Sequence, residues 1–270
     1  MSDDGAQRDL DEVRRDLVEE QEVLDGIVAA LEPEQWSLST PSPGWNVTDQ
    51  IGHLTFFDGT AALAISDAEA FAADTRVLFA AGLDESVGFD QFTLGAFRER
   101  TRDGRLEAWR ANRRILAEAA AMLTPGQRVP WYGPSMGENS FISARLMEVW
   151  AHGTDVVDAV GSVREPTDRL RHIAKLGFIT RKWSYTVRGE PVPEGEVRVE
   201  LVAPSGAQWR YGPDEATDIV SGTAEDFCLV VTQRRHVDDT GLVAGGLGHH
   251  WLLRAQAFAG GPTGPPARRR

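Results

Sequence analysis

Residues 145–160, RLMEVWAHGTDVVDAV, combine a helical apolar pattern with a row of ionisable side chains. The apolar residues recur at the three- and four-residue spacing of one helix face; they are Leu146, Val149, Trp150, Val156, Val157 and Val160. Glu148 and His152 stand at positions i and i+4, so both side chains lie on the same side of the predicted helix. Their row of charges is either a solvated surface or one half of a binding site.

Similar patterns predict that the first two thirds of the chain are helical. Leucine, isoleucine and valine residues form one amphipathic stripe that ends before Pro33. Asn46, followed three residues later by Asp49, is typical of a capped helix start. Besides the helix that ends at Gly161, these patterns predict helices over residues 8–31, 47–72, 90–123 and 167–188.

The C-terminal third changes to alternating and mixed patterns. The segment EVRVELVAPSGAQWRYGP at 196–213 alternates with a period of two around a glycine-containing turn, which predicts a β-hairpin. We expect an α+β fold, in which a helix bundle precedes a smaller α+β domain. The expected parts are the bundle (1–190), the α+β domain (195–260) and a disordered tail (261–270). Within the α+β domain we expect further strands at 218–222 and 237–246 and helices at 224–235 and 249–260.

Composition narrows the class of protein. The net charge of −13 argues against nucleic acid or an anionic membrane surface as the main partner, because both favour clustered lysine and arginine. Cys228 is the single cysteine, so an internal disulfide is impossible, and we expect it to be a small buried hydrophobic residue. The N-terminus is acidic and polar, and no stretch approaches the roughly 20 apolar residues of a membrane span. These features predict a cytoplasmic protein.

A partner for Glu148 and His152 is found in the predicted helix 47–72. His53 shares its face with Phe56 and Phe57 and therefore points toward the apolar side. Facing helices of a bundle commonly supply metal ligands to a shared core. The three side chains would form a two-histidine, one-carboxylate set, which suits Zn(II) or non-haem Fe(II). The alternative is that His53 is a hydrogen-bonded core residue and the other two a surface pair contributing a few tenths of a kcal/mol.

Three motifs in a fixed order resemble the maleylpyruvate isomerase family of mycothiol-dependent enzymes, over nearly the whole chain. They are TPSPGWNVTDQIGHL (40–54), RLMEVWAHGTDVVDAVG (145–161) and SGTAEDFCLVVTQRR (221–235). The resemblance implies a DinB-like four-helix bundle in the N-terminal part. It also implies a divalent metal, usually zinc, bound by His53, Glu148 and His152. The run EDFCLVVTQRRHVDDT further indicates a less characterised, metal-binding branch of the family.

The resemblance also implies a reaction. With mycothiol as cosubstrate and a small-molecule electrophile as substrate, we expect a thiol-dependent transferase or isomerase. Arg234 matches the family position whose arginine faces the active site and holds a substrate carboxylate, with Arg235 beside it as the alternative. Asp155 lies one turn beyond His152 and is a candidate either to orient that imidazole or to bind substrate.

Two other classes stay open. One is a metal-dependent hydrolase or oxygenase that uses the same three ligands. The other is a non-catalytic protein that binds a metal and a small ligand, with a sterol-carrier-like C-terminal domain and Asp155 or Asp58 as a fourth metal ligand. The sequence has no G-x-S-x-G motif and no phosphate-binding glycine loop, which argues against serine hydrolases and nucleotide enzymes.

Overall fold

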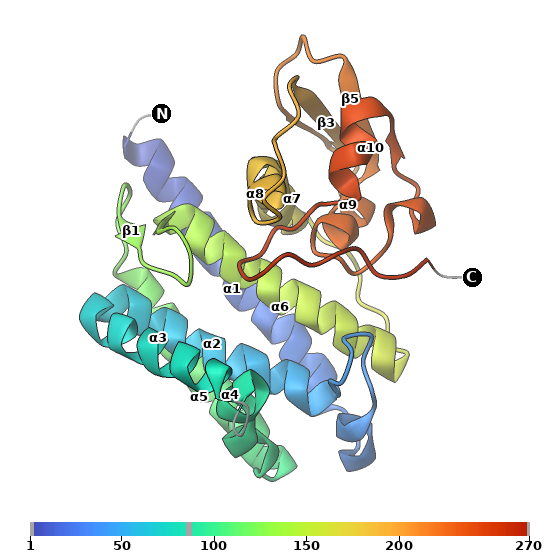
Figure 1. The fold of residues 1–270 in the computed structure, drawn as a ribbon. Coiled ribbons are helices and arrows are strands. Elements are labelled where there is room, and N and C mark those ends of the chain that lie inside the picture. Colours follow the sequence, from blue (N-terminus) through green and yellow to red (C-terminus); the bar gives the residue numbers. More distant parts are fainter. Residues whose placement is uncertain (1–2, 85–87, 269–270) are drawn as a thin grey trace. The chain divides into compact units, whose positions relative to one another are not determined.

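The chain divides into two compact units, Met1–Val163 and Arg164–Arg270, in a computed structural model that describes residues 3–84 and 88–268. The N-terminal unit is helical and the C-terminal unit is a smaller mixed α/β structure, which confirms the predicted α+β fold (Figure 1). The division comes before the predicted helix 167–188, which the sequence analysis grouped with the bundle. This segment packs within the second unit, where Gly177 lets the side chain of Val231 approach so closely that a Cβ atom would lie 2.7 Å from it.

Four long helices form the bundle of the N-terminal unit (Figure 1). Helix α1 packs against α6 and α5, while α2 packs against α5 and α6. Their apolar faces meet in a core that includes fully buried Leu10, Ile51, Trp109 and Leu146. The four helices are α1 (Asp3–Ala29), α2 (Val47–Ser66), α5 (Arg102–Ala121) and α6 (Glu138–Val160).

Two predicted helices are each divided by a capping residue. The helix expected over 47–72 ends at Ser66, because Asp67 is extended and its carboxylate accepts hydrogen bonds from backbone amides of the next helix, α3 (Ala68–Leu83). The helix expected over 90–123 is divided into α4 (Gly88–Arg98) and α5. Thr101 is extended and caps the start of α5, where its side chain accepts a hydrogen bond from the Gly104 amide. Both single-helix predictions were therefore wrong at these positions.

The start of α2 is fixed by the predicted cap. The Asn46 side chain accepts a hydrogen bond from the Asp49 amide, and the Asp49 carboxylate accepts one from the Asn46 amide. Asp49 also forms an ion pair with Arg98 of α4, with 2.7 Å between Oδ1 and Nε. This cap holds the helix turn that precedes His53.

Short elements complete the N-terminal unit. The 3-10 helix η1 (Pro33–Ser37) precedes a loop that returns at an isolated bridge between Ser39 and Asn46. A small hairpin of β1 (Arg128–Val129) and β2 (Met136–Gly137) leads into α6, which ends at Gly161 with φ of 65°. The sequence analysis predicted no strand in this segment.

The C-terminal unit is built on a four-stranded sheet of order β4-β3-β5-β6. The predicted hairpin is confirmed as an antiparallel pair, and β5 runs parallel to β3 beside it. The predicted helix 249–260 is α10, which spans only Gly246–Leu252, because the backbone amides that follow bond elsewhere. The Gln256 amide donates to Ser184 Oγ, and the Ala257 amide donates to the Val231 carbonyl. The elements are α7 (Leu170–Ile179), α8 (Arg181–Thr186), β3 (Val197–Val202), β4 (Gln208–Tyr211), β5 (Asp218–Thr223), α9 (Ala224–Val231), η2 (Val237–Asp239), β6 (Val243–Ala244) and α10.

Part of the segment expected to be a disordered tail is hydrogen-bonded to this unit. Thr263 donates from Oγ1 to Gln233 Oε1 at 2.8 Å, and its backbone amide donates to Gln256 Oε1 at 3.2 Å. Gln233 follows α9 and has φ of 60°, a left-handed conformation that is uncommon for a residue with a side chain. The tail therefore helps to hold the chain where α9 ends.

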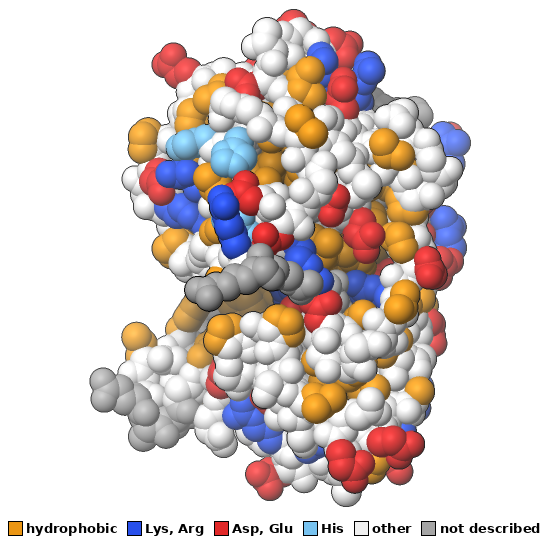
Figure 2. All heavy atoms as spheres, turned by 90° about the vertical axis from the view of Figure 1, so that its right-hand side faces the viewer, with side chains coloured by type: hydrophobic (Ala, Val, Ile, Leu, Met, Phe, Trp, Pro, Cys, Tyr) orange, Lys and Arg blue, Asp and Glu red, His pale blue; other side chains and the backbone are white. Residues whose placement is uncertain are grey.

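Acidic and basic side chains are interspersed on the molecular face drawn in Figure 2. Across residues 3–84 and 88–268, no helix is both long and apolar enough to cross a membrane.

Candidate metal centre

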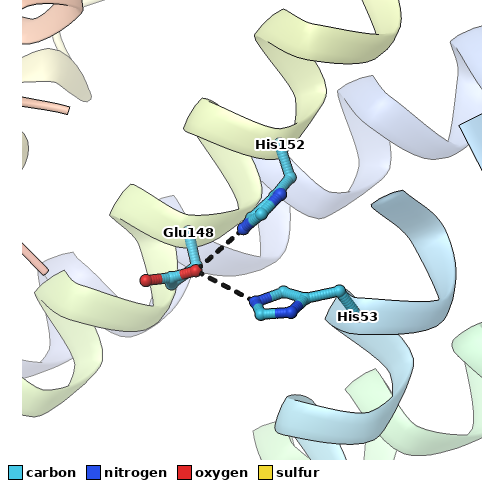
Figure 3. A group of neighbouring side chains, drawn as sticks. All are labelled: His53, Glu148 and His152. Atoms are coloured by element: carbon cyan, nitrogen blue, oxygen red, sulfur yellow. Dashed lines mark hydrogen bonds and ion pairs between the residues drawn. The ribbon is translucent and has the colours of Figure 1, made fainter. Parts of the chain in front are cut away.

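Helices α2 and α6 bring three predicted ligands together (Figure 3). His53 projects from α2, and Glu148 and His152 project from successive turns of α6. One ligand atom from each side chain lies within 4.8 Å of the other two. Within the described part of the chain, this is the group of histidine, cysteine and carboxylate side chains that meets the geometry of a metal site.

One carboxylate oxygen stands at the centre of the cluster. Glu148 Oε2 lies 3.0 Å from His152 Nε2 and 3.4 Å from His53 Nε2. Burial of the Glu148 carboxyl opposes its ionisation, but the hydrogen bonds and charges of the two histidines outweigh this effect and hold its pKa well below the ordinary range. The glutamate is therefore an anion that faces two imidazole nitrogens.

Aromatic rings cover the histidines. The Trp45 ring centroid lies 5.2 Å from that of His53 and 6.0 Å from that of His152. Phe57, one turn after His53, contacts the same imidazole at 4.5 Å between centroids. Trp45 is held in turn by its indole N–H, which donates to Asp90 at 2.9 Å. The side chains of the cluster are between 11% and 19% exposed, so a small molecule retains access.

Gln50 supplies a contact that the sequence analysis missed. Its Oε1 lies 2.5 Å from His152 Nδ1, on the side of the imidazole opposite Glu148. Gln50 is fully buried and lies one turn before His53 on α2. That spacing was the available signal, because it places the amide on the same helix face as His53.

The donor set fits a divalent cation. A carboxylate has no hydrogen to give, so two nitrogens that share one of its oxygens require either protons or a metal ion between them. Two imidazoles and one carboxylate form a common three-ligand set for zinc and other divalent metals, and this set leaves further coordination positions open.

The other candidate ligands are engaged elsewhere. Asp155 is buried, and its Oδ2 accepts a hydrogen bond from Ser42 at 3.0 Å. Asp58 is fully buried and pairs with Arg145 at 3.0 Å, while Gln21 donates to its second oxygen at 3.3 Å. Neither carboxylate belongs to the converging group.

Arg234 belongs to the second unit, three residues after α9. Its backbone amide donates to the Leu229 carbonyl at 2.7 Å, and its guanidinium donates to the Thr232 carbonyl. Arg235 bonds to the carbonyl of Arg234. The role expected of Arg234 stays a prediction. Cys228 is fully buried and burial raises the pKa of its thiol well above the ordinary value, which confirms the predicted inert hydrophobic residue.

A helix bundle with two histidines and one glutamate converging between two of its helices has the ligand arrangement of metal-binding bundle proteins. Residues 17–157 match the family model of the mycothiol maleylpyruvate isomerase N-terminal domain, and the chain belongs to this family. The predicted family is thereby confirmed.

Relatives and solved structures extend the match beyond the bundle. Uncharacterised proteins of Mycobacterium tuberculosis strains CDC 1551 and H37Rv are each 41% identical over 256 residues, which cover 94% of this chain and 96% of theirs. Crystal structures of mycothiol-dependent maleylpyruvate isomerase and of its histidine-to-alanine mutant are similar in fold, with TM-scores of 0.55 and 0.56. Each is 16% identical to this chain and the match covers 87% of this chain and 92% of the other.

Proposed function

We propose that the protein is a divalent-metal enzyme, with zinc as the expected metal, that uses mycothiol to transfer a thiol to a small electrophile or to isomerise it. The observation that supports this proposal is the convergence of His53, Glu148 and His152 in a chain of this family. Family membership favours a thiol over water as the cosubstrate. It also favours an enzyme over a structural metal protein.

The chain's own side chains would hold the metal as follows. The two imidazole Nε2 atoms and the Glu148 carboxylate provide three ligands with one negative charge between them. A divalent cation held by these three side chains would keep a net positive charge, and it would supply the electrostatic stabilisation that favours the thiolate form of a bound thiol near neutral pH. The carboxylate, anionic before any ion arrives, lowers the cost of bringing the cation out of water.

Surrounding residues would prepare the site for a thiolate nucleophile. Trp45 and Phe57 contact the histidine rings and reduce their exposure to water, which strengthens electrostatic interactions in the site. We further propose that Arg234 binds a carboxylate of the electrophile, since guanidinium groups form paired hydrogen bonds with carboxylates. Asp155, whose carboxylate accepts from Ser42, is proposed to orient the imidazole of His152 or to bind substrate.

The first test is the metal content of the purified protein, followed by calorimetric titration with mycothiol. We expect about one zinc per chain in the wild type and a loss of zinc in His53→Ala and in Glu148→Ala, because each removes one of three ligands. Mycothiol should bind the zinc-loaded protein and not the protein stripped of metal.

A histidine outside the cluster provides the control. His249 is 40% exposed and lies in the second unit, so His249→Ala should keep both zinc and thiol binding. A wild type that holds no zinc and takes up none when it is supplied would contradict the proposal. Zinc binding without any mycothiol binding would contradict its thiol part and favour the hydrolase or ligand-binding class.

A further inference from the structure

We infer that Gln50 is a positioning residue that accepts a hydrogen bond from His152 Nδ1 and so fixes the orientation of the ring, with Nε2 facing Glu148 and the proposed metal. This inference rests on the proposed function only where it concerns the metal. The geometry behind it is a chain of hydrogen bonds from the loop at Thr40 through Gln50 to His152.

The first step is the orientation of the Gln50 amide, whose oxygen and nitrogen are distinguished by their partners. Thr40 Oγ1 donates its single hydrogen to the Trp45 carbonyl, 3.0 Å away. Toward Gln50, at 2.8 Å, the hydroxyl can therefore only accept, so the Gln50 NH₂ group must face it. The amide oxygen is then left to face the imidazole.

The second step is the tautomer of His152. An amide oxygen only accepts hydrogen bonds, so the Nδ1 atom 2.5 Å away must carry a hydrogen. A neutral imidazole with its hydrogen on Nδ1 has its lone pair on Nε2. This is the nitrogen that lies 3.0 Å from Glu148 Oε2 in the cluster. With a metal bound, Gln50 would therefore hold the hydrogen on Nδ1 while Nε2 faces the ion; without a metal, the Glu148 carboxylate draws a hydrogen to Nε2 as well.

The third step is the rigidity of the arrangement. Gln50 is fully buried, and His152 is 9% exposed, so water does not readily replace a lost hydrogen bond between them. The Trp45 whose carbonyl anchors Thr40 also stacks its ring near His152. Outer hydrogen bonds of this kind hold ligating histidines in place, and their loss typically weakens metal binding by about 10- to 100-fold.

The test compares Gln50→Met, which keeps the length of the side chain without its amide, with Gln50→Glu, which keeps an acceptor oxygen. The hydrogen bond from His152 Nδ1 to residue 50 is measured by ¹H–¹⁵N NMR in zinc-loaded protein, from the rate at which the Nδ1–H signal exchanges with water, and the signal is assigned by its loss in His152→Asn. The same signal is measured in metal-free protein in acid, where both imidazole nitrogens carry hydrogens. Zinc affinity is measured by competition with a chromophoric chelator. Gln21→Met is the matched control, because Gln21 is another buried glutamine on the bundle, bonded to Asp58 instead of a proposed ligand.

We expect a slowly exchanging Nδ1–H signal in the wild type, in Gln50→Glu and in Gln21→Met, and a rapidly exchanging or absent signal in Gln50→Met. The zinc dissociation constant should rise about 10- to 100-fold in Gln50→Met and less in Gln50→Glu. An unchanged Nδ1–H signal in Gln50→Met would overturn the inference, as would an equal effect of Gln21→Met. If the wild type binds no zinc, the proposed function fails, while the Nδ1–H signal of the metal-free protein still decides the role of Gln50.

Discussion

At the level of single residues, one contact of the Glu148 carboxylate could be predicted from sequence spacing and the other could not. Its pairing with His152 is local, since the i, i+4 spacing on one helix sets their proximity. His53 is 95 positions away from Glu148, so its approach depends on how two helices pack. Spacing along the sequence cannot predict this approach, and the family resemblance indicated it instead. The contact of Trp45 was not foreseen, because it depends on the course of a loop. The contact of Gln50 depends, like the approach of His53, on how α2 packs against α6.

Arg234 allows a test of substrate recognition by one residue. If it binds a substrate carboxylate, Arg234→Gln should raise the KM for a carboxylate-bearing electrophile roughly tenfold or more, since a charged hydrogen bond contributes about 1.5–3 kcal/mol. The KM for the methyl ester of the same compound should change little. Steady-state kinetics with mycothiol and both compounds would measure the difference.

Its neighbour serves as the comparison. Arg235→Gln removes the same charge one position along the chain, where the guanidinium bonds to the carbonyl of Arg234. If Arg235→Gln alone abolishes the preference for the acid over the ester, the assignment to Arg234 is wrong and the binding arginine is its neighbour.

At the level of elements, a buried ion pair joins the two helices that carry the cluster. Asp58 of α2 and Arg145 of α6 are both almost inaccessible, and Arg145 also lies 5.9 Å from the centre of the Trp131 ring. Burial raises the pKa of Asp58, and the charge and hydrogen bond of Arg145 counter this effect. The pair follows His53 on α2 and precedes Glu148 on α6, as the antiparallel packing of these helices requires.

Removing one partner of the Asp58–Arg145 pair should lower the stability of the protein. We expect Asp58→Ala to lower the free energy of unfolding by about 3–5 kcal/mol, because it leaves the Arg145 charge buried without a counter-ion. Replacing both partners by apolar residues, in Asp58→Leu with Arg145→Met, should restore much of that loss. Urea unfolding followed by circular dichroism measures both. A double variant less stable than Asp58→Ala would show that the charge pair itself is required.

The helix breaks at Asp67 and Thr101 show a limit of sequence patterns for elements. Apolar periodicity continues across both positions, so it predicted longer helices than the structure has. The sequence does contain the residues of two helix starts: Asp67 and Thr101 have short side chains that can cap a helix, and each is followed two residues later by an acidic residue, Glu69 and Asp103. Such residues also occur inside helices, and the tertiary packing of α3 and α4 decides that they act as caps here.

For the molecule as a whole, the bundle should lose stability in acid. Asp25 of α1 accepts two hydrogen bonds from Arg110 of α5 and lies 2.8 Å from Arg113. The hydrogen bond from Arg110, with the charges of both arginines, lowers the pKa of Asp25 from 3.8 against the opposing effect of burial. A lowered pKa in the folded state means that the stabilisation is present above about pH 3.8 and is lost as the pH falls through the folded value.

The corresponding variant is Asp25→Asn. It should lower the free energy of unfolding by about 1–2 kcal/mol at pH 7, and the difference from wild type should shrink below pH 3.8. Asp11→Asn, at a carboxylate that is 56% exposed and paired with Arg14, should change stability by much less. Chemical unfolding of all three proteins at pH 7 and pH 3 makes the comparison. A constant difference across this range would contradict the role of Asp25.

The molecular architecture was predictable in outline, and the division into units was less so. The change from helical to alternating patterns identified the α+β class and the hairpin of β3 and β4. The segment 167–188 has the same helical character as the bundle, and nothing local in its sequence shows that it packs beside α9. Apolar periodicity predicts that one face of a helix is buried, but it does not predict which other element covers that face.

The distance along the chain between His53 and Glu148 bears on the order of events during synthesis. Because α6 is the last helix of the bundle to leave the ribosome, a nascent chain that ends before it has one of the three side chains of the cluster. The cluster can therefore assemble only after α6 has docked against α2. If the side chains bind zinc as proposed, uptake of the ion by stalled nascent chains of increasing length would report when the bundle closes.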